Sequence, residues 1–175
     1  MMYSSDVFCK VVFLLSNHSV AGEVNLKDRR LSDLLNETRD SVVVLLNATL
    51  ARLSDPGKIQ SRDPSTVLPK TKIMIAFELT STGIGAKRLY GYQKKRKYHV
   101  VMTTESMEIR GFLHATTDID LRVLAGGQSE RFVPVTNAVV TLRANDKLVI
   151  EQEVVLVNVH HNEYFSLGDA EPSEE

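Results

Sequence analysis

The chain of 175 residues has one cysteine, no long apolar run and a formal net charge of −1, and each scarcity excludes a class of protein. Cys9 has no second cysteine to pair with, which rules out a disulfide scaffold and fits a reducing compartment. The longest apolar candidate, residues 11–15, is far shorter than the roughly 20 residues that cross a bilayer. Asp6 stands where a signal peptide would carry Lys or Arg. We therefore expect a soluble, cytoplasmic protein without a membrane partner.

Patterns that carry catalysis or bind metal are also missing. No G-x-S-x-G motif and no spaced Ser/His/Asp set occurs, and the G-x-G at residues 83–85 lacks the third glycine of a phosphate loop. The lone cysteine has no closely spaced histidine, and His160 and His161 would point to opposite faces of a strand. We expect no catalytic residue, no metal site and no cofactor, and hence no enzyme. His18 and His114 would offer an acid or base only if a pocket formed around them.

The composition that remains is that of an ordinary globular protein. Hydrophobic residues make up 43% of the chain and charged residues 25%, which excludes intrinsic disorder and collagen-like structure. A chain of this length folds as one or two small domains.

The near-neutral net charge conceals an uneven distribution. Residues 81–98 hold six Lys or Arg and no Asp or Glu, whereas residues 168–175 hold four acidic residues and no basic one. The basic stretch is interpreted either as a solvated connector between domains or as a nucleic-acid-binding segment, in which cations contact phosphates and tyrosine rings stack on bases. The acidic end is either a frayed terminus or a segment that folds back on the basic stretch. The candidate nucleic-acid-binding residues are Lys87, Arg88, Tyr92, Lys94, Lys95, Arg96, Lys97 and Tyr98.

The chain also repeats itself. At an offset of 89, Val11, Val12, Val20, Gly22 and Val24 align with Val100, Val101, Ile109, Gly111 and Leu113. At an offset of 90, Leu31, Leu34, Val42, Asn47 and Ala48 align with Leu121, Leu124, Phe132, Asn137 and Ala138. Further on, Ile73, Ile75 and Phe77 align with Val155, Val157 and Val159 at an offset of 82, which places eight extra residues in the turn-rich segment 54–70. This pattern predicts an internal duplication.

Within each copy most segments alternate apolar and polar residues, as half-buried strands do. Gly111 falls inside a predicted strand over residues 107–115, where a missing side chain indicates a sharp bend or a close backbone crossing. Pro134 falls inside another strand and is expected at an edge or a bulge. Between the second and third strands, Leu31, Leu34 and Leu35 share one helical face, and Asp28 is expected to cap this turn. We expect the helical turn to plug one end of a small barrel, and the alternative is an exposed stripe that binds a partner.

Residues 20–24, 30–36 and 42–48, with the matching layout of residues 100–167, resemble an uncharacterised bacterial Sm-like domain of unknown function. The resemblance implies an all-β fold with minor helical turns, namely two tandem five-stranded antiparallel barrels of the SH3/Sm type. The implied organisation is a first barrel at 7–80, a basic linker at 81–97, a second barrel at 98–167 and an acidic tail at 168–175. The second Sm signature is absent around Asn158, so no RNA-binding residue is transferred from the family.

Small barrels of this type leave strand edges that must be covered or used. We therefore expect a noncatalytic binding or scaffolding module that assembles through its edge strands, with a ring-like homo-oligomer as one outcome and a compact monomer as the other. A protein partner is the related possibility. The alternative function is nucleic-acid (RNA) binding through the basic, tyrosine-containing stretch.

Overall fold

The computed structural model describes residues 7–79, 95–126 and 130–171, and these form ten strands in one antiparallel sheet. The first half of the chain contributes β1 (Phe8–Leu14), β2 (His18–Asn25), α1 (Leu31–Asn36), β3 (Val42–Arg52), β4 (Asp55–Pro69), the 3-10 turn η1 (Lys70–Lys72) and β5 (Ile75–Glu78). The second half contributes β6 (Arg96–Thr103), β7 (Met107–Ala115), α2 (Leu121–Ala125), β8 (Phe132–Leu142), β9 (Asn145–Asn158), the 3-10 turn η2 (Val159–His161) and β10 (Tyr164–Glu171).

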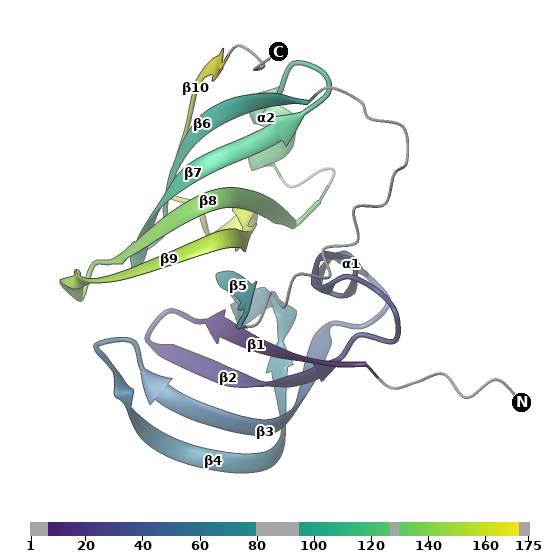
Figure 1. Cartoon of the computed structure of the whole chain (residues 1–175), viewed down its shortest axis with the longest axis vertical. Helices are drawn as coiled ribbons and strands as arrows, with labels where there is room; N and C mark the ends of the chain where they lie inside the picture. Colours follow the sequence, from purple (N-terminus) through teal and green to yellow (C-terminus); the bar gives the residue numbers. More distant parts are fainter. Residues whose placement is uncertain (1–6, 80–94, 127–129, 172–175) are drawn as a thin grey trace, which may run out of the picture.

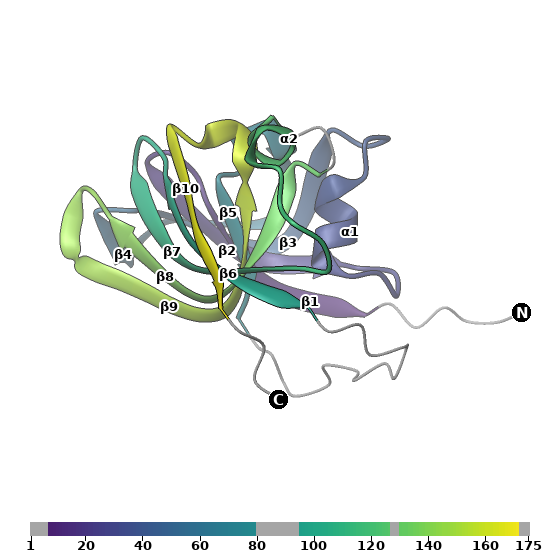
Figure 2. The ribbon, with the colours of Figure 1, turned by 90° about the horizontal axis from the view of Figure 1, so that it is seen from above.

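The two halves have the same order of elements, but they do not form two closed barrels. Each half is a strongly curved sheet, and the halves lie one above the other (Figures 1 and 2). The strand order is β10-β6-β7-β8-β9-β5-β1-β2-β3-β4, so β5 and β9 join the halves into one open sheet. Because β5 pairs with β1 on one side and with β9 on the other, neither of its edges is left to close the first half against β4. The all-β prediction is confirmed, and closure into separate barrels is not observed.

The bend predicted at Gly111 is present, and it recurs at Gly22. The pairing register shifts at both glycines, and the residues across from them, Asn47 and Asn137, have φ angles of 50° and 47°. A Cβ atom on Gly111 would lie 2.6 Å from the Thr136 carbonyl oxygen, so only glycine lets β7 and β8 approach this closely. The same unusual geometry at matched positions supports the internal repeat.

The last step of the sequence alignment is wrong. Residues 55–69 form the long strand β4 rather than an inserted run of turns, so β4 corresponds to β9 and the short strand β5 corresponds to β10 at an offset of 89. The prolines in β4 suggested turns, but within the described residues β4 pairs with β3 alone, and an edge strand tolerates residues that lack an N–H group. Pro134 follows the same rule, because β8 extends past its pairing with β7 at that point.

The predicted boundaries also change at the basic linker and the acidic tail. Arg96 and Lys97 belong to β6, and residues 168–171 continue β10 past a bulge. Glu171 pairs with Lys97, so the described part of the acidic end does fold back on the basic stretch. The remaining linker residues up to 94 and the last four residues lie outside the described part of the chain.

The helix α1 packs into the core much as expected. Leu31 and Leu35 are buried, and the carboxylate of Asp33 accepts a hydrogen bond from the Arg30 backbone N–H, so Asp28 is not the cap. The second helix α2 buries none of its residues and is capped by Asp120. Neither helix, nor any other in the described residues, is long and apolar enough to cross a membrane.

The bend at Gly111 gives a first prediction. We expect Gly111→Ala to destabilise the fold by about 1–3 kcal/mol, because the added methyl group would press on backbone atoms of β8. Gly57→Ala is the matched control, since a Cβ there meets nothing closer than 3.9 Å. Urea unfolding of both variants measures the difference. Equal stability of Gly111→Ala and the wild type would contradict the close approach.

Candidate functional site

The strongest candidate for a functional feature is the junction where β5 of the first half pairs with β9 of the second. Ile75 pairs with Val157 and Ala76 with Leu156 in antiparallel register. The Asn158 backbone N–H donates to the Met74 carbonyl at 2.8 Å, and its side-chain amide donates to the Ile73 carbonyl at 2.8 Å. Backbone and side chain of Asn158 therefore extend the pairing beyond the strand itself.

Side chains at the junction insert into both cores. Ile75 comes from the first half but packs in the hydrophobic cluster of the second half, where it is 0% exposed. Leu156 comes from the second half but packs in the cluster of the first half, where it is 6% exposed. Each half therefore completes the core of the other.

A second asparagine fixes the helix α1 against the second half. The Asn36 side-chain amide donates to the Phe132 carbonyl at 2.9 Å, and its oxygen accepts from the Phe132 backbone N–H at 2.8 Å. Phe132 is fully buried in the first-half core. This two-way contact joins residues 96 positions apart and satisfies the backbone at the start of β8.

The two end strands of the sheet carry the counterparts of the junction residues. At the offset of 89, Val67 and Leu68 on β4 correspond to Leu156 and Val157, and Tyr164 on β10 corresponds to Ile75. Within the described residues β4 pairs with β3 alone and β10 with β6 alone. Val67 is 53% exposed and Tyr164 is 58% exposed, in contrast to their buried counterparts. One edge of the described sheet therefore carries the counterpart of the β9 side of the junction, and the other edge carries the counterpart of the β5 side.

The end strands do not copy the junction in full. Pro69 stands where β9 has Asn158, and Gly126 stands where α1 has Asn36. Neither residue can make the side-chain hydrogen bonds described above. The polar contacts therefore distinguish the internal junction from its exposed counterparts, whereas the apolar positions are shared.

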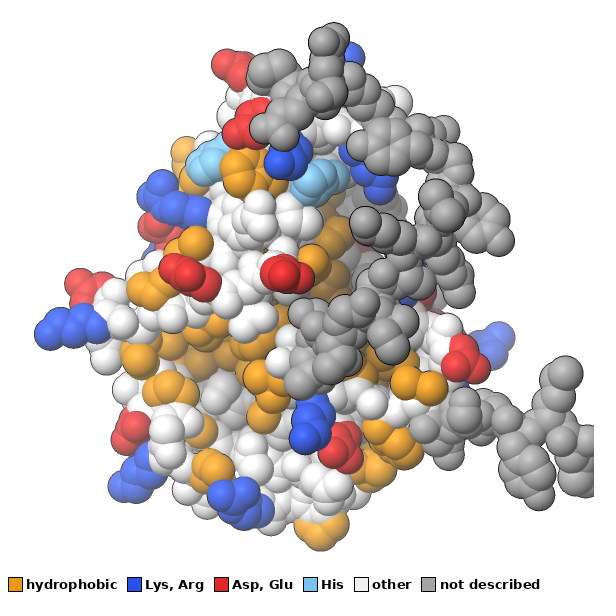
Figure 3. Space-filling view, viewed as in Figure 1, with side chains coloured by type: hydrophobic (Ala, Val, Ile, Leu, Met, Phe, Trp, Pro, Cys, Tyr) orange, Lys and Arg blue, Asp and Glu red, His pale blue; other side chains and the backbone are white. Residues whose placement is uncertain are grey.

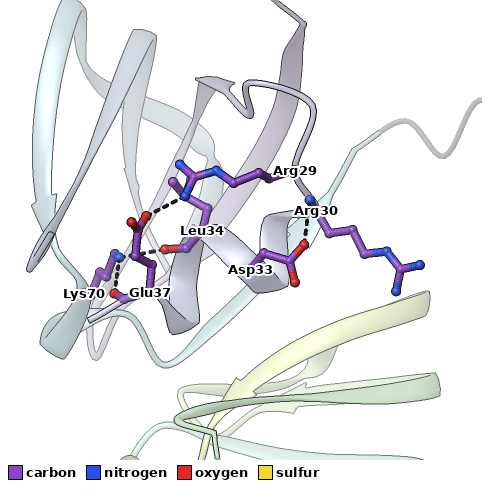
Figure 4. Close-up of polar contacts among 6 residues, drawn as sticks. All are labelled: Arg29, Arg30, Asp33, Leu34, Glu37 and Lys70. Carbon is purple, nitrogen blue, oxygen red and sulfur yellow. Dashed lines mark hydrogen bonds and ion pairs between the residues drawn. The ribbon is translucent and has the colours of Figure 1, made fainter. Parts of the chain in front are cut away.

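A buried lysine holds α1 in the orientation that the junction requires (Figure 4). Lys70 is almost fully buried, and its ammonium donates to the carbonyls of Leu34 at 2.6 Å and Glu37 at 2.8 Å, at the C-terminal end of the helix. Burial lowers the pKa of Lys70 below its usual 10.5. Arg29 donates to the Glu37 carboxylate at 2.5 Å, and this hydrogen bond lowers the pKa of Glu37. Sequence reasoning missed Lys70 because a lysine after a proline-rich segment indicates an exposed turn.

The predicted nucleic-acid-binding residues have different positions in the structure. Lys87, Arg88, Tyr92 and Lys94 lie outside the described residues. Lys95 and Lys97 are exposed, and Arg96 forms an ion pair with Asp118 at 2.7 Å. Tyr98 is 6% exposed and its hydroxyl contacts Asp118 at 3.4 Å, so its ring offers no face on which a base could stack.

Cavities follow the seam between the halves, where hydrophobic side chains form a band (Figure 3). One of about 440 Å³ is lined mainly by apolar residues of both halves. Another, of about 470 Å³, lies where four hairpin turns meet and is lined by His18, Arg52, Glu105 and Arg143 among others. His114 lies elsewhere, on β7. The described residues place no acid in hydrogen-bond contact with His18 and contain no group of three or more His, Cys, Asp or Glu that could hold a metal ion.

The buried lysine generates a prediction about stability. We expect Lys70→Met to cost about 2 kcal/mol, because it leaves two partly buried carbonyls without their donor. The stability of the wild type relative to Lys70→Met should also rise as the pH approaches 10.5, since the folded chain releases the Lys70 proton at a lower pH than the unfolded chain does. Both proteins share the opposing effect of Cys9, whose pKa is raised to about 11 by burial. Lys72→Met, at an exposed position, is the control. Denaturant unfolding at neutral and alkaline pH tests both statements, and a Lys70→Met variant as stable as the control would refute them.

The geometry of the junction is the most informative functional observation in the molecule. No family model matches the sequence, and no curated protein or solved structure matches it significantly. The Sm-like resemblance therefore stays a prediction, and the function has to be argued from the β5–β9 junction and from the two strands that end the sheet.

Proposed function

We propose that the protein is a noncatalytic binding or scaffolding module that assembles with further copies of itself through β4 and β10. The observation that carries this proposal is the β5–β9 junction, in which a fifth strand of one half already pairs with a fourth strand of the other. Within the described residues the sheet ends in a fourth strand, β4, on one side and a fifth strand, β10, on the other, and each has one unpaired edge. Pairing β10 of one chain with β4 of the next repeats a contact that this sequence already makes. In this proposal residues 7–80 and 98–167 are two Sm-like units.

The side chains at the two ends suit such a contact. In the repeated register Tyr164 lies opposite Leu68 of the next chain, and Phe165 lies opposite Val67. Tyr164 would then enter the first-half core of the neighbour, as Ile75 enters the second-half core within the chain. Apolar residues on an unpaired edge are otherwise an aggregation hazard, which gives a reason for them to be covered.

The proposed contact is heterologous, because it joins two different surfaces. Repetition of such a contact closes into a ring when the rotation between neighbours permits and otherwise continues as a filament. A closed ring leaves no edge strand exposed, whereas a filament leaves one at each end. We therefore propose a ring-like homo-oligomer in which each chain supplies two positions.

Light scattering coupled to size-exclusion chromatography over a range of concentrations tests the assembly. The measured mass of the wild type should exceed that of a monomer. Val67→Lys and Tyr164→Lys should each lower the measured mass, because a lysine at a buried strand contact leaves an unpaired charge. We expect the dissociation constant to rise at least about tenfold in either variant. Val149→Lys is the control, since Val149 is a similarly exposed valine at the far end of β9.

Mixing the two variants tests the polarity of the contact. Val67→Lys retains an intact β10, and Tyr164→Lys retains an intact β4, so the mixture should form a dimer and nothing larger. A symmetric contact between two β4 strands would instead leave Tyr164→Lys dimeric by itself. A wild type that is strictly monomeric at every concentration would overturn the proposal.

A further inference from the structure

A second surface, on the outer face of β6 and β7, combines cationic side chains with a partly exposed aromatic ring. Alternate residues of each strand point outward, so Lys97 and His99 are exposed on β6, while Phe112 and His114 face outward on β7. Lys97 pairs with His114, and His99 pairs with Phe112. The register therefore gathers these four side chains into one compact block, here called the β6–β7 face.

The Phe112 ring contacts the side chains of both Lys97 and His99. The Lys97 ammonium lies 5.7 Å from the centroid of the Phe112 ring, and the His99 ring meets the Phe112 ring edge-on at 5.7 Å with an interplanar angle of 82°. The His114 Nε2 atom lies 2.6 Å from the Thr136 hydroxyl on β8. In Figure 3 histidine side chains lie beside basic and hydrophobic side chains on the upper half of the molecule.

The positive charges of two lysines act on His114. Burial and the positive charges of Lys97 and Lys95 lower the pKa of His114. Arg110, farther along the same face, is paired with Glu108 at 2.6 Å, so these two charges offset each other. Two acidic residues of β10 lie beside this face: Glu171 pairs with Lys97, and Asp169 lies in the bulge opposite His99. An anion that displaced Glu171 would find one ammonium and two imidazoles.

The structure assigns the β6–β7 face to a single-stranded nucleic acid, with phosphates bound by Lys97, His99 and His114 and a base stacked on the Phe112 ring. Positively charged surfaces with an exposed ring bind single strands in this way, because phosphates take the cations and any base has a face to stack. Lys97 has a long, flexible side chain, so its ammonium can move from the ring to a phosphate when a base arrives. The surface does not include Val67 or Tyr164, which carry the proposed assembly.

The sequence predicted that tyrosine rings stack on the bases, whereas in this assignment the stacking ring is that of Phe112. Tyr98 alternates inward and is buried, whereas Phe112 alternates outward on the neighbouring strand. The Phe112 ring favours a nucleic acid over other anionic ligands. Free phosphate or an acidic peptide would use the cations alone and would gain nothing from Phe112.

Fluorescence anisotropy with a labelled octauridylate at low salt tests the assignment on the full chain. We expect Lys97→Glu to weaken binding at least tenfold and Phe112→Ala about tenfold, since one stacked base is lost. Lys147→Glu, an exposed lysine at the β8–β9 turn, is the matched control and should bind almost as the wild type does, because only the long-range field changes. Lys97→Met should reduce the slope of log K against the logarithm of the salt concentration by about one. Binding should tighten as the pH falls below 6.5, because the pKa of His114 is lowered in the free protein and a bound phosphate favours its charged form.

Two further experiments test whether nucleic acid, rather than another anion, binds to this face. Nuclear magnetic resonance titration of the histidines should show the pKa of His114 rising on addition of octauridylate, and the same measurement in the Val67→Lys background separates binding from assembly. Tripolyphosphate and polyglutamate are the competing probes. Equal affinity for either probe, or octauridylate binding that survives both Lys97→Glu and Phe112→Ala, would overturn the assignment, as would an absence of binding at low salt.

Discussion

The structure depends on a strand of four residues that has no free edge. β5 pairs with β1 and with β9, and its consecutive side chains enter different cores, Ile75 that of the second half and Ala76 that of the first. Because residues alternate across a strand, one short segment can complete two hydrophobic cores at once. The two halves are consequently interdependent, and the strands that would otherwise close each half become the two ends of a single sheet.

Hydrogen bonds then distinguish the internal junction from the exposed ends. Apolar pairing alone is weakly specific, since burial of a valine or leucine is worth about 1.5–3 kcal/mol at many alternative contacts. The hydrogen bonds of Asn36 and Asn158 are directional, because each side chain meets particular backbone groups. A different pairing of the strands would leave those groups without a hydrogen-bond partner. Their replacement by Gly126 and Pro69 at the equivalent positions means that a contact between chains, as proposed, would be weaker than the contact within the chain and more easily reversed.

Local features of the fold could be predicted from the sequence, whereas long-range contacts could not. The strand at 107–115, the bend at Gly111 and the buried face of Leu31 and Leu35 are all present, because alternation, a mid-strand glycine and helical spacing are local signals. β4 was mistaken for turns because an exposed edge strand has neither apolar alternation nor a penalty on proline. The roles of Asn36 and Lys70, and the partnership of Lys97 with Phe112, depend on which strands become neighbours, and no local pattern encodes that.

β10 links the two proposed surfaces, because its first residue lies on the assembly edge and its last residue pairs with Lys97 of the β6–β7 face. Tyr164 lies on the proposed assembly edge, and Glu171 pairs with Lys97 beyond the bulge between Leu167 and Ala170. A neighbour that paired with the start of β10 would also hold the strand along β6 and keep Glu171 near Lys97. A nucleic acid on the β6–β7 face would have to compete with that carboxylate. Thermodynamic linkage makes the two events reciprocal, so assembly and nucleic-acid binding would each weaken the other through this one strand.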